Sequence, residues 1–233
     1  MIYFNGRALE DVAPVKIVDV LVSPIKLEAV ARQRPFRFGA DFVRMTGGSR
    51  TAAITFALLT NEPDTRQRQL VEITRWARSD EPGRLTLPGH DGVYLEAICT
   101  ALPEPSLRQW WESKLRIVFT TYDNPYWTSI SEKSARCGDA FTALGTAPPM
   151  MRIVNTATSA LTNITYGNGT QSMRFSTIPA GNLEIDLNRQ TAAVNGASIM
   201  RYYPLSGATF LQPKLGAQTI SGAGTVKWRE RWE

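Results

Sequence analysis

The amino-acid sequence changes character near its middle. Residues 1–122 hold long stretches in which apolar and polar side chains alternate, together with many arginines. The residues after Pro148 form short segments rich in Thr, Asn, Gly and Ala, and the intervening residues 123–149 show little periodicity. Periodic segments bury one face, whereas aperiodic segments do not, so the pattern predicts two domains and a linker. The predicted parts are domain one at 1–128, the linker at 129–148 and domain two at 149–233.

Alternation with a period of two predicts that the first domain is mostly antiparallel β structure. Successive side chains of a strand point to opposite faces, so this period buries one face and leaves the other in solvent. The predicted strands cover residues 2–4, 15–30 with a bend near Ser23-Pro24, 36–45 beginning with Phe36 and Phe38, 53–59, 85–87, 93–97 and 111–122. Thr46-Gly47-Gly48-Ser49 predicts a hairpin turn between two of them.

One segment of the first domain shows the period of a helix instead. Its apolar positions share one face and are Leu70, Ile73, Trp76 and Ala77. Asp64 is in a position to cap the N-terminus, with Gln67 three residues later, and Pro82 lies beyond the C-terminus, where proline cannot continue a helix. We therefore predict one helix at about residues 65–78, which covers a sheet in an α+β, split-barrel-like domain.

The second domain carries turn residues at regular intervals between short apolar runs. The predicted turns lie at Asn155, Gly167-Asn168-Gly169, Pro179-Ala180-Gly181-Asn182, Asn195-Gly196 and Ser206-Gly207. Short strands separated in this way are typical of a β-sandwich. The whole chain is therefore predicted to be mainly β.

The charge distribution argues against a nucleic-acid-binding protein. The net charge is +5. Residues 1–130 carry 16 basic and 15 acidic residues, a difference of +1, and residues 131–233 carry 10 and 6, a difference of +4. Nucleic-acid-binding surfaces gather basic residues into one patch, and the sequence has no such run with aromatic residues among it. We expect the arginines on solvated faces and in ion pairs between subunits.

Residues that usually carry catalysis are sparse and poorly spaced. His90 is the only histidine, and it lies in a Pro-Gly-His-Asp-Gly sequence typical of a turn. Glu184 and Asp186 would share one face of a strand, which more often faces solvent than forms a catalytic pair. Cys99 and Cys137 match no metal-binding or redox spacing, and we expect free thiols. The sequence therefore predicts no catalytic, cofactor-binding or metal-binding residues.

Targeting and anchoring segments are not recognisable in the sequence. No run reaches the ~18 apolar residues that a membrane-spanning helix needs. The first residues lack the basic region followed by an apolar run that marks a signal peptide. We expect synthesis in a cytosol and no membrane insertion.

Short motifs follow one another in a recognisable order. In the first half they are Tyr3-Phe4-Asn5-Gly6, Pro35-Phe36-Arg37-Phe38-Gly39, the strand from Gly48 to Phe56, the helix Arg66–Arg78, the hairpin from Gly83 to Tyr94, and Asn124-Pro125-Tyr126-Trp127. In the second half they are Gly145-Thr-Ala-Pro-Pro149, Arg152-Ile-Val-Asn155, Ile185-Asp-Leu-Asn188 and Val194-Asn-Gly196. By their order and spacing, the whole chain resembles the siphophage distal tail protein family (Dit), a component of the tail-tip hub. The usual Arg-Asp-Gly turn is replaced by Arg37-Phe38-Gly39.

The resemblance implies a structural protein of the virion and not an enzyme. It implies a homohexameric ring, formed by the N-terminal domains, that joins the tail tube to the baseplate or tail tip around a channel for DNA. The C-terminal domain would be galectin-like or carbohydrate-module-like and would project outward. The implied partners are further copies of the chain, the tail tube protein, the tail-tip hub or tail-associated protein, and a receptor-binding protein. DNA would pass without specific binding, no cofactor is implied, and the protein would be made in the bacterial host cytoplasm and reside at the phage tail tip.

A carbohydrate-binding module for host-surface attachment is the main alternative function. The second domain carries aromatic residues that could stack on sugar rings, namely Tyr166, Tyr202, Tyr203, Trp228 and Trp232. The same aromatic residues could instead fill the core of the sandwich. An enzyme and a nucleic-acid-binding protein are further alternatives. The poor spacing of catalytic residue types argues against the first, and the dispersed charge argues against the second.

Overall fold

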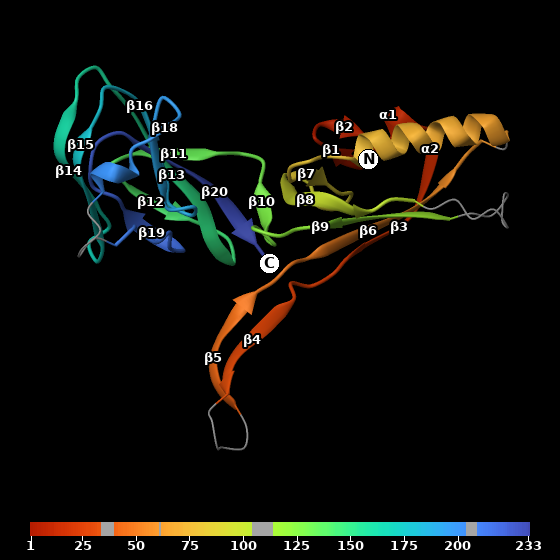
Figure 1. Ribbon diagram of the computed structural model, residues 1–233, viewed down its shortest axis with the longest axis horizontal. Coiled ribbons are helices and arrows are strands. Elements are labelled where there is room, and N and C mark those ends of the chain that lie inside the picture. Colours follow the sequence, from red (N-terminus) through yellow and green to blue (C-terminus); the bar gives the residue numbers. More distant parts are fainter. Residues whose placement is uncertain (34–39, 61, 104–113, 204–208) are drawn as a thin grey trace. The chain divides into compact units, whose positions relative to one another are not determined.

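The computed structural model describes residues 1–33, 40–60, 62–103, 114–203 and 209–233. The chain divides into two compact units: unit 1 is Met1–Trp127 with Glu233, and unit 2 is Thr128–Trp232 (Figure 1). Strands dominate both units, so the predicted mainly β fold class is confirmed. Phe36 and Phe38, which were predicted to begin a strand, lie outside the described residues.

Unit 1 is built on an antiparallel sheet with one longer helix. Its strands are β1 (Tyr3–Phe4), β2 (Arg7–Ala8), β3 (Val15–Val22), β4 (Leu27–Gln33), β5 (Ala40–Gly47), β6 (Thr51–Leu58), β7 (Gly83–Thr86), β8 (Val93–Ala101) and β9 (Leu115–Thr120). Its helices are α1 (Leu9–Val12) and α2 (Pro63–Ala77). The main sheet has the order β3-β6-β9-β8-β7-β1-β2. The chain leaves unit 1 through β10 (Trp127–Ser129).

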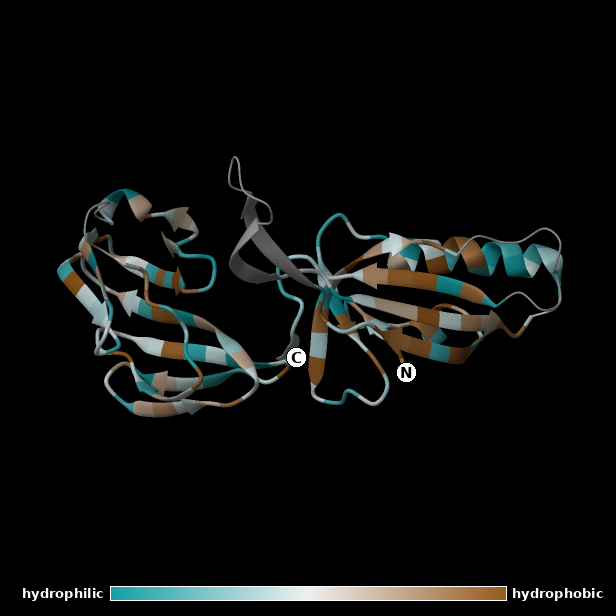
Figure 2. Cartoon of the chain, turned by 90° about the horizontal axis from the view of Figure 1, so that it is seen from below, coloured by the Kyte–Doolittle hydropathy of each residue, from teal (hydrophilic) through white to brown (hydrophobic). Residues whose placement is uncertain are grey.

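Helix α2 packs on this sheet through a cluster of three aromatic rings. Trp76 from α2 lies 5.9 Å from Phe4 of β1 and 6.1 Å from Phe119 of β9, measured between ring centroids. Phe4 and Phe119 are themselves 4.9 Å apart. The indole N–H of Trp76 donates a hydrogen bond of 2.9 Å to the backbone carbonyl of Arg7, so the buried ring has its polar atom satisfied. The apolar face predicted for α2 is thus confirmed as its buried face (Figure 2).

The start of α2 differs from the prediction. The helix begins at Pro63, one residue before the predicted cap Asp64, and the N-cap residue is Glu62. Proline suits the first helical position because its fixed φ matches a helix and its missing N–H would be unpaired there in any case. The side chain of Asp64 therefore lies in the first turn, where a carboxylate still favours the helix dipole.

The hairpin turn predicted at residues 46–49 does not exist, because β5 and β6 pair with different strands. Strand β5 pairs with β4, and β6 pairs with β3. Backbone hydrogen bonds from Ser23 N–H to Thr51 O (2.8 Å) and from Gly48 N–H to Lys26 O (2.6 Å) join the two ladders. Gly48 does not take the positive φ that a two-residue hairpin turn needs. Strands β3 and β6 thus form the proximal part of a two-stranded ribbon, and β4 and β5 form its distal part.

Unit 2 consists of short antiparallel strands around its own core, as expected for the predicted β-sandwich. Its strands are β11 (Lys133–Arg136), β12 (Ala140–Ala143), β13 (Ala147–Ala157), β14 (Leu161–Gly167), β15 (Ser172–Ile178), β16 (Gly181–Asp186), β17 (Thr191–Val194), β18 (Ala197–Ser198), β19 (Gly216–Thr219) and β20 (Thr225–Trp232). One sheet has the order β18-β17-β16-β13-β20-β11, and β12-β19 and β14-β15 are separate pairs. A short helix, η1 (Met200–Tyr202), follows β18. Buried residues from both sheet and pairs form the core, including Tyr166, Phe175, Ile185 and Val226.

The stretch predicted as a linker, residues 129–148, is instead part of the fold of unit 2. Strand β11 pairs with β20, and β12 pairs with β19. Of the apolar side chains in this stretch, Phe141, Ala143 and Ala147 are buried. Backbone hydrogen bonds to β20 and β19 hold these residues, and such bonds leave no periodic apolar pattern in the sequence.

Candidate functional site

His90, the only histidine, does not take part in a catalytic arrangement within the described residues. It lies in the turn between β7 and β8, where its backbone N–H donates to the carbonyl of Leu87 at 3.2 Å. Its ring stacks on Trp127, with centroids 4.0 Å apart and an interplanar angle of 14°. A general base needs a partner that orients the ring toward a substrate, and the neighbour of this ring is an indole.

The carboxylates of Glu184 and Asp186 are each engaged in structural contacts. Glu184 accepts a hydrogen bond of 2.8 Å from Arg152, and Asp186 accepts two of 2.9 Å from the backbone N–H groups of Asn188 and Arg189. The first is an ion pair between strands, and the second closes the turn after β16. This pair therefore shows none of the geometry of a glycoside hydrolase, in which both carboxyl groups face one bond.

Both cysteines are free and half-buried. Burial raises the pKa of the Cys99 and Cys137 thiols, so neither is activated as a thiolate. The described residues contain no group of three or more His, Cys, Asp or Glu side chains that could hold a metal ion. Within the same residues, no helix is long and apolar enough to cross a membrane.

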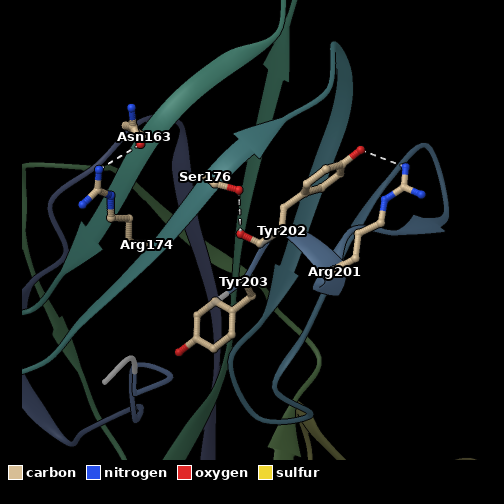
Figure 3. Close-up of a pocket in the computed structure, with 6 residues that line it drawn as sticks. All are labelled: Asn163, Arg174, Ser176, Arg201, Tyr202 and Tyr203. Atoms are coloured by element: carbon tan, nitrogen blue, oxygen red, sulfur yellow. Dashed lines mark hydrogen bonds between the residues drawn. The ribbon is translucent and has the colours of Figure 1, made fainter. Parts of the chain in front are cut away.

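A hollow of about 370 Å³ lies on the surface of unit 2 (Figure 3). It is lined by Asn163, Arg174, Ser176, Arg201, Tyr202 and Tyr203. These residues come from β14, from β15, and from η1 with the residue that follows it, which are separated in the sequence but adjacent in the fold. Figure 3 shows Asn163 and Arg174 on one side of Ser176, with Tyr202 and Arg201 on the other.

Helix η1 is held so that two of its side chains reach the surface. Tyr203, just after η1, packs against Phe175 and Phe210 in the core, with ring centroids at 5.5 and 5.0 Å. The hydroxyl of Ser176 donates a hydrogen bond of 3.2 Å to the carbonyl of Tyr202. Arg201 and the half-buried Tyr202 are thereby presented together at the hollow.

The two arginines of the hollow are tied to neutral groups. A guanidinium N–H of Arg174 donates a hydrogen bond of 2.8 Å to the amide oxygen of Asn163. The backbone of Asn163 has a φ of +53°, and the pairing of β14 with β15 is interrupted at this residue. Arg201 lies over the ring of Tyr202 at 4.7 Å and donates 2.8 Å to its hydroxyl. Neither arginine forms an ion pair in the described part of the chain. Each guanidinium retains further N–H donors, since a guanidinium has five.

The aromatic residues proposed for stacking on sugar separate into two groups. Tyr166 and Trp228 are buried in the core, at 0% and 5% exposure, and cannot contact a ligand. Tyr202 and Tyr203 line the hollow, whereas Trp232 is half-buried near the end of β20. Sequence reasoning missed Asn163, Arg174, Ser176 and Arg201 as lining residues.

A second hollow, of about 460 Å³, lies in unit 1 beside the end of β3. Arg50, His90 and Trp127 line it, together with Leu21, whose side chain is 60% exposed. Most of the residues that line it are apolar.

Neither a protein-family model nor a curated protein matches the sequence. Solved structures do match the fold. The crystal structure of the Dit protein of phage SPP1, described as a paradigm of the hub adsorption apparatus in phages infecting Gram-positive bacteria, matches with a TM-score of 0.76 and 13% identity, over 100% of this chain and 98% of that chain. The baseplate of phage P2 in its activated conformation with Ca matches with a TM-score of 0.51 and 7% identity, over 93% of this chain and 90% of that chain. The chain therefore has the fold of a phage Dit protein, and the predicted resemblance to the distal tail proteins is confirmed at the level of the fold.

Proposed function

We propose that the protein is a structural component of a phage tail and serves as a distal tail protein in the hub. The observation that carries the proposal is the match to the SPP1 Dit fold, which extends over the whole chain and includes both units. The sites described above agree with a structural role, because they hold ion pairs, turns and shallow hollows.

We infer further that the chain assembles into a homohexameric ring through unit 1. The ribbon formed by β4 and β5 supports this inference, because the two strands pair with each other and with no other described strand. A two-stranded ribbon is at best marginally stable in water unless another surface packs against it. A neighbouring copy would supply that surface, and a repeated contact between two different faces closes into a ring when its rotation permits.

In this role the ring would join the tail tube protein to the tail-tip hub or tail-associated protein, and DNA would pass through its channel. Unit 2 would project outward and support a receptor-binding protein. The location would be the tail tip of the virion. These partners are part of the proposal and follow from the hub role.

The assembly is tested with the purified full chain. Light scattering coupled to size exclusion gives the mass over a range of concentrations, and negative-stain images give the symmetry. We expect closed rings with six subunits, with the population increasing at higher concentration. A chain that stays monomeric at every concentration and also fails to bind a tail tube protein would contradict the hub role.

A further inference from the structure

The hollow of unit 2 is lined by three kinds of group. Arg174 and Arg201 supply positive charge, Asn163 and Ser176 supply neutral hydrogen-bonding groups, and Tyr202 supplies an aromatic ring. Binding sites for small ligands are typically concave, with a few polar groups directed at one place. The volume of about 370 Å³ lies within the range of about 300–1,000 Å³ for such sites.

The charge of this hollow is not balanced by the residues around it. Arg174 and Arg201 are exposed, and neither forms an ion pair within the described residues. The sequence that follows Tyr203, Pro204-Leu-Ser-Gly-Ala208, contains no carboxylate. Elsewhere in unit 2 other arginines are paired, as Arg152 is with Glu132 and Glu184. The hollow is therefore a locally positive site, and an anion is the ligand that such a site favours.

The neutral groups select among anions. The hydroxyl of Ser176 already donates to the carbonyl of Tyr202, and the amide oxygen of Asn163 already accepts from Arg174. The oxygen of Ser176 can still accept and the amide N–H groups of Asn163 can still donate, and this combination suits hydroxyl groups, because a hydroxyl does both. The half-buried ring of Tyr202 is an amphipathic surface that suits a flat, partly apolar ligand. A simple carboxylate or phosphate offers no hydroxyls and no apolar face, whereas an acidic sugar offers all three features.

We propose that this hollow binds an acidic saccharide, a sugar ring that carries or adjoins a carboxylate or phosphate group. Arg174 and Arg201, which lie on opposite sides of Ser176, each bind an anionic group of such a saccharide, and Asn163 and Ser176 bind hydroxyls. Tyr202, fixed by Arg201, contacts the face of the ring. This binding does not depend on the ring assembly, since every residue involved lies in unit 2.

The proposal is tested by calorimetric titration of the full chain with defined polymers at low and moderate salt. Oligogalacturonate offers sugar with carboxylates, and a sugar-bearing glycerol phosphate polymer offers sugar with phosphates, so the two arms identify the source of the anion. Dextran offers neutral sugar, and polyglutamate offers carboxylates without sugar. We expect binding to at least one of the acidic saccharides, weakened by salt, with little binding to dextran or polyglutamate.

Variants connect the binding to the hollow. Arg201→Gln and Arg174→Gln should each weaken binding by about tenfold, since hydrogen bonds to charged groups are the strong ones. Arg189→Gln is the matched control: it removes the same charge from an exposed arginine of unit 2 outside the hollow, and affinity should stay within about twofold. Because all three side chains are exposed, their thermal midpoints should match that of the unsubstituted chain.

Four outcomes overturn the proposal. One is no binding of either acidic saccharide at millimolar concentration and low salt. A second is equal binding of polyglutamate, which would mean charge attraction alone. A third is equal binding of dextran, which would mean that the arginines do not select an anion. The last is an equal loss of affinity in Arg189→Gln and Arg201→Gln.

Discussion

Two charged side chains are buried in the described part of the chain, and their surroundings differ. Glu230 is 6% exposed, and it accepts hydrogen bonds from the ammonium of Lys133 at 2.6 Å and from the backbone N–H of Leu144 at 3.2 Å. Arg50 is 5% exposed, and its Nε and Nη1 atoms have no hydrogen-bond partner. Burial lowers the pKa of the Arg50 guanidinium, an effect that Glu233 and Tyr126 partly offset. The buried charge of Glu230 is thus compensated by neighbouring donors, whereas the buried charge of Arg50 is compensated only in part.

Replacing Arg50 by methionine should stabilise unit 1. The substitution removes two buried donors without partners and keeps an unbranched side chain, so the free energy of unfolding should rise by about 1–3 kcal/mol. Urea unfolding followed by tryptophan fluorescence measures this. The control is Arg116→Met, at an exposed position of β9, which should change stability by less than about 0.5 kcal/mol. A lower midpoint for Arg50→Met than for the unsubstituted chain would show that the guanidinium is stabilising.

Replacing Glu230 by glutamine should destabilise unit 2. The substitution removes the charge that pairs with Lys133 while the site stays buried, and we expect a loss of about 2 kcal/mol. Glu184→Gln is the comparison, because it also removes an ion pair, with Arg152, but at a side chain that is 53% exposed. Exposed pairs contribute less than about 1 kcal/mol. Equal losses in the two variants, measured by urea unfolding, would contradict the role assigned to burial.

At the scale of secondary-structure elements, the ribbon of residues 15–58 has two distinct parts. Strands β3 and β6 belong to the main sheet of unit 1, where β6 also pairs with β9. Strands β4 and β5 pair only with each other among the described strands. The hydrogen bond between Gly48 N–H and Lys26 O lies at the boundary between the two parts. The proximal part therefore belongs to the main sheet of unit 1, and the distal part is the contact that the proposed ring would use.

Shortening the ribbon should separate folding from assembly. Replacing residues 27–47 by Asn-Gly joins two positions that already lie side by side, and a shorter connection lowers the entropy lost on folding only slightly. The free energy of unfolding should stay within about 1 kcal/mol of that of the full chain. The mass from light scattering should be that of a monomer under conditions where the full chain forms rings. Rings of the shortened chain at the same concentration would show that β4 and β5 are not the contact.

At the scale of the whole molecule, each unit has its own core. The core of unit 1 contains the aromatic cluster of Phe4, Trp76 and Phe119. The core of unit 2 contains Tyr166 and Phe175, both fully buried. A unit that buries its own apolar residues and closes its own strand pairs meets the physical requirement for independent folding.

We therefore predict that residues 128–233 fold without unit 1. The isolated fragment should show a dispersed amide spectrum by nuclear magnetic resonance and a single cooperative thermal transition. Glu230→Gln should lower the stability of the fragment by the same amount as in the full chain, because Lys133 and Leu144 are both within the fragment. A fragment with a collapsed, undispersed spectrum would show that unit 2 needs unit 1.

Local patterns in the sequence predicted most elements of the fold. Alternation of apolar and polar residues indicated β3 and β6, because a strand that buries one face has every second side chain on that face. Four apolar residues on one face indicated α2. Asn5 and Gly6 adopt positive φ, at 51° and 81°, as Asn-Gly pairs readily do in turns.

Pairing over long distances was decided by the tertiary structure alone. Strand β6 follows β5 in the sequence yet pairs with the distant β3, and residues 129–148 join the sheets of unit 2 through backbone bonds that any residue type can make. The hollow of unit 2 brings Asn163 and Arg174 beside Arg201, and the burial of Arg50 depends on neighbours such as Thr121 and Trp127. Periodicity thus determined which residues turn inward, because that depends on neighbours along the chain. Only the fold determined which strands and side chains meet, because that depends on contacts between segments far apart in sequence.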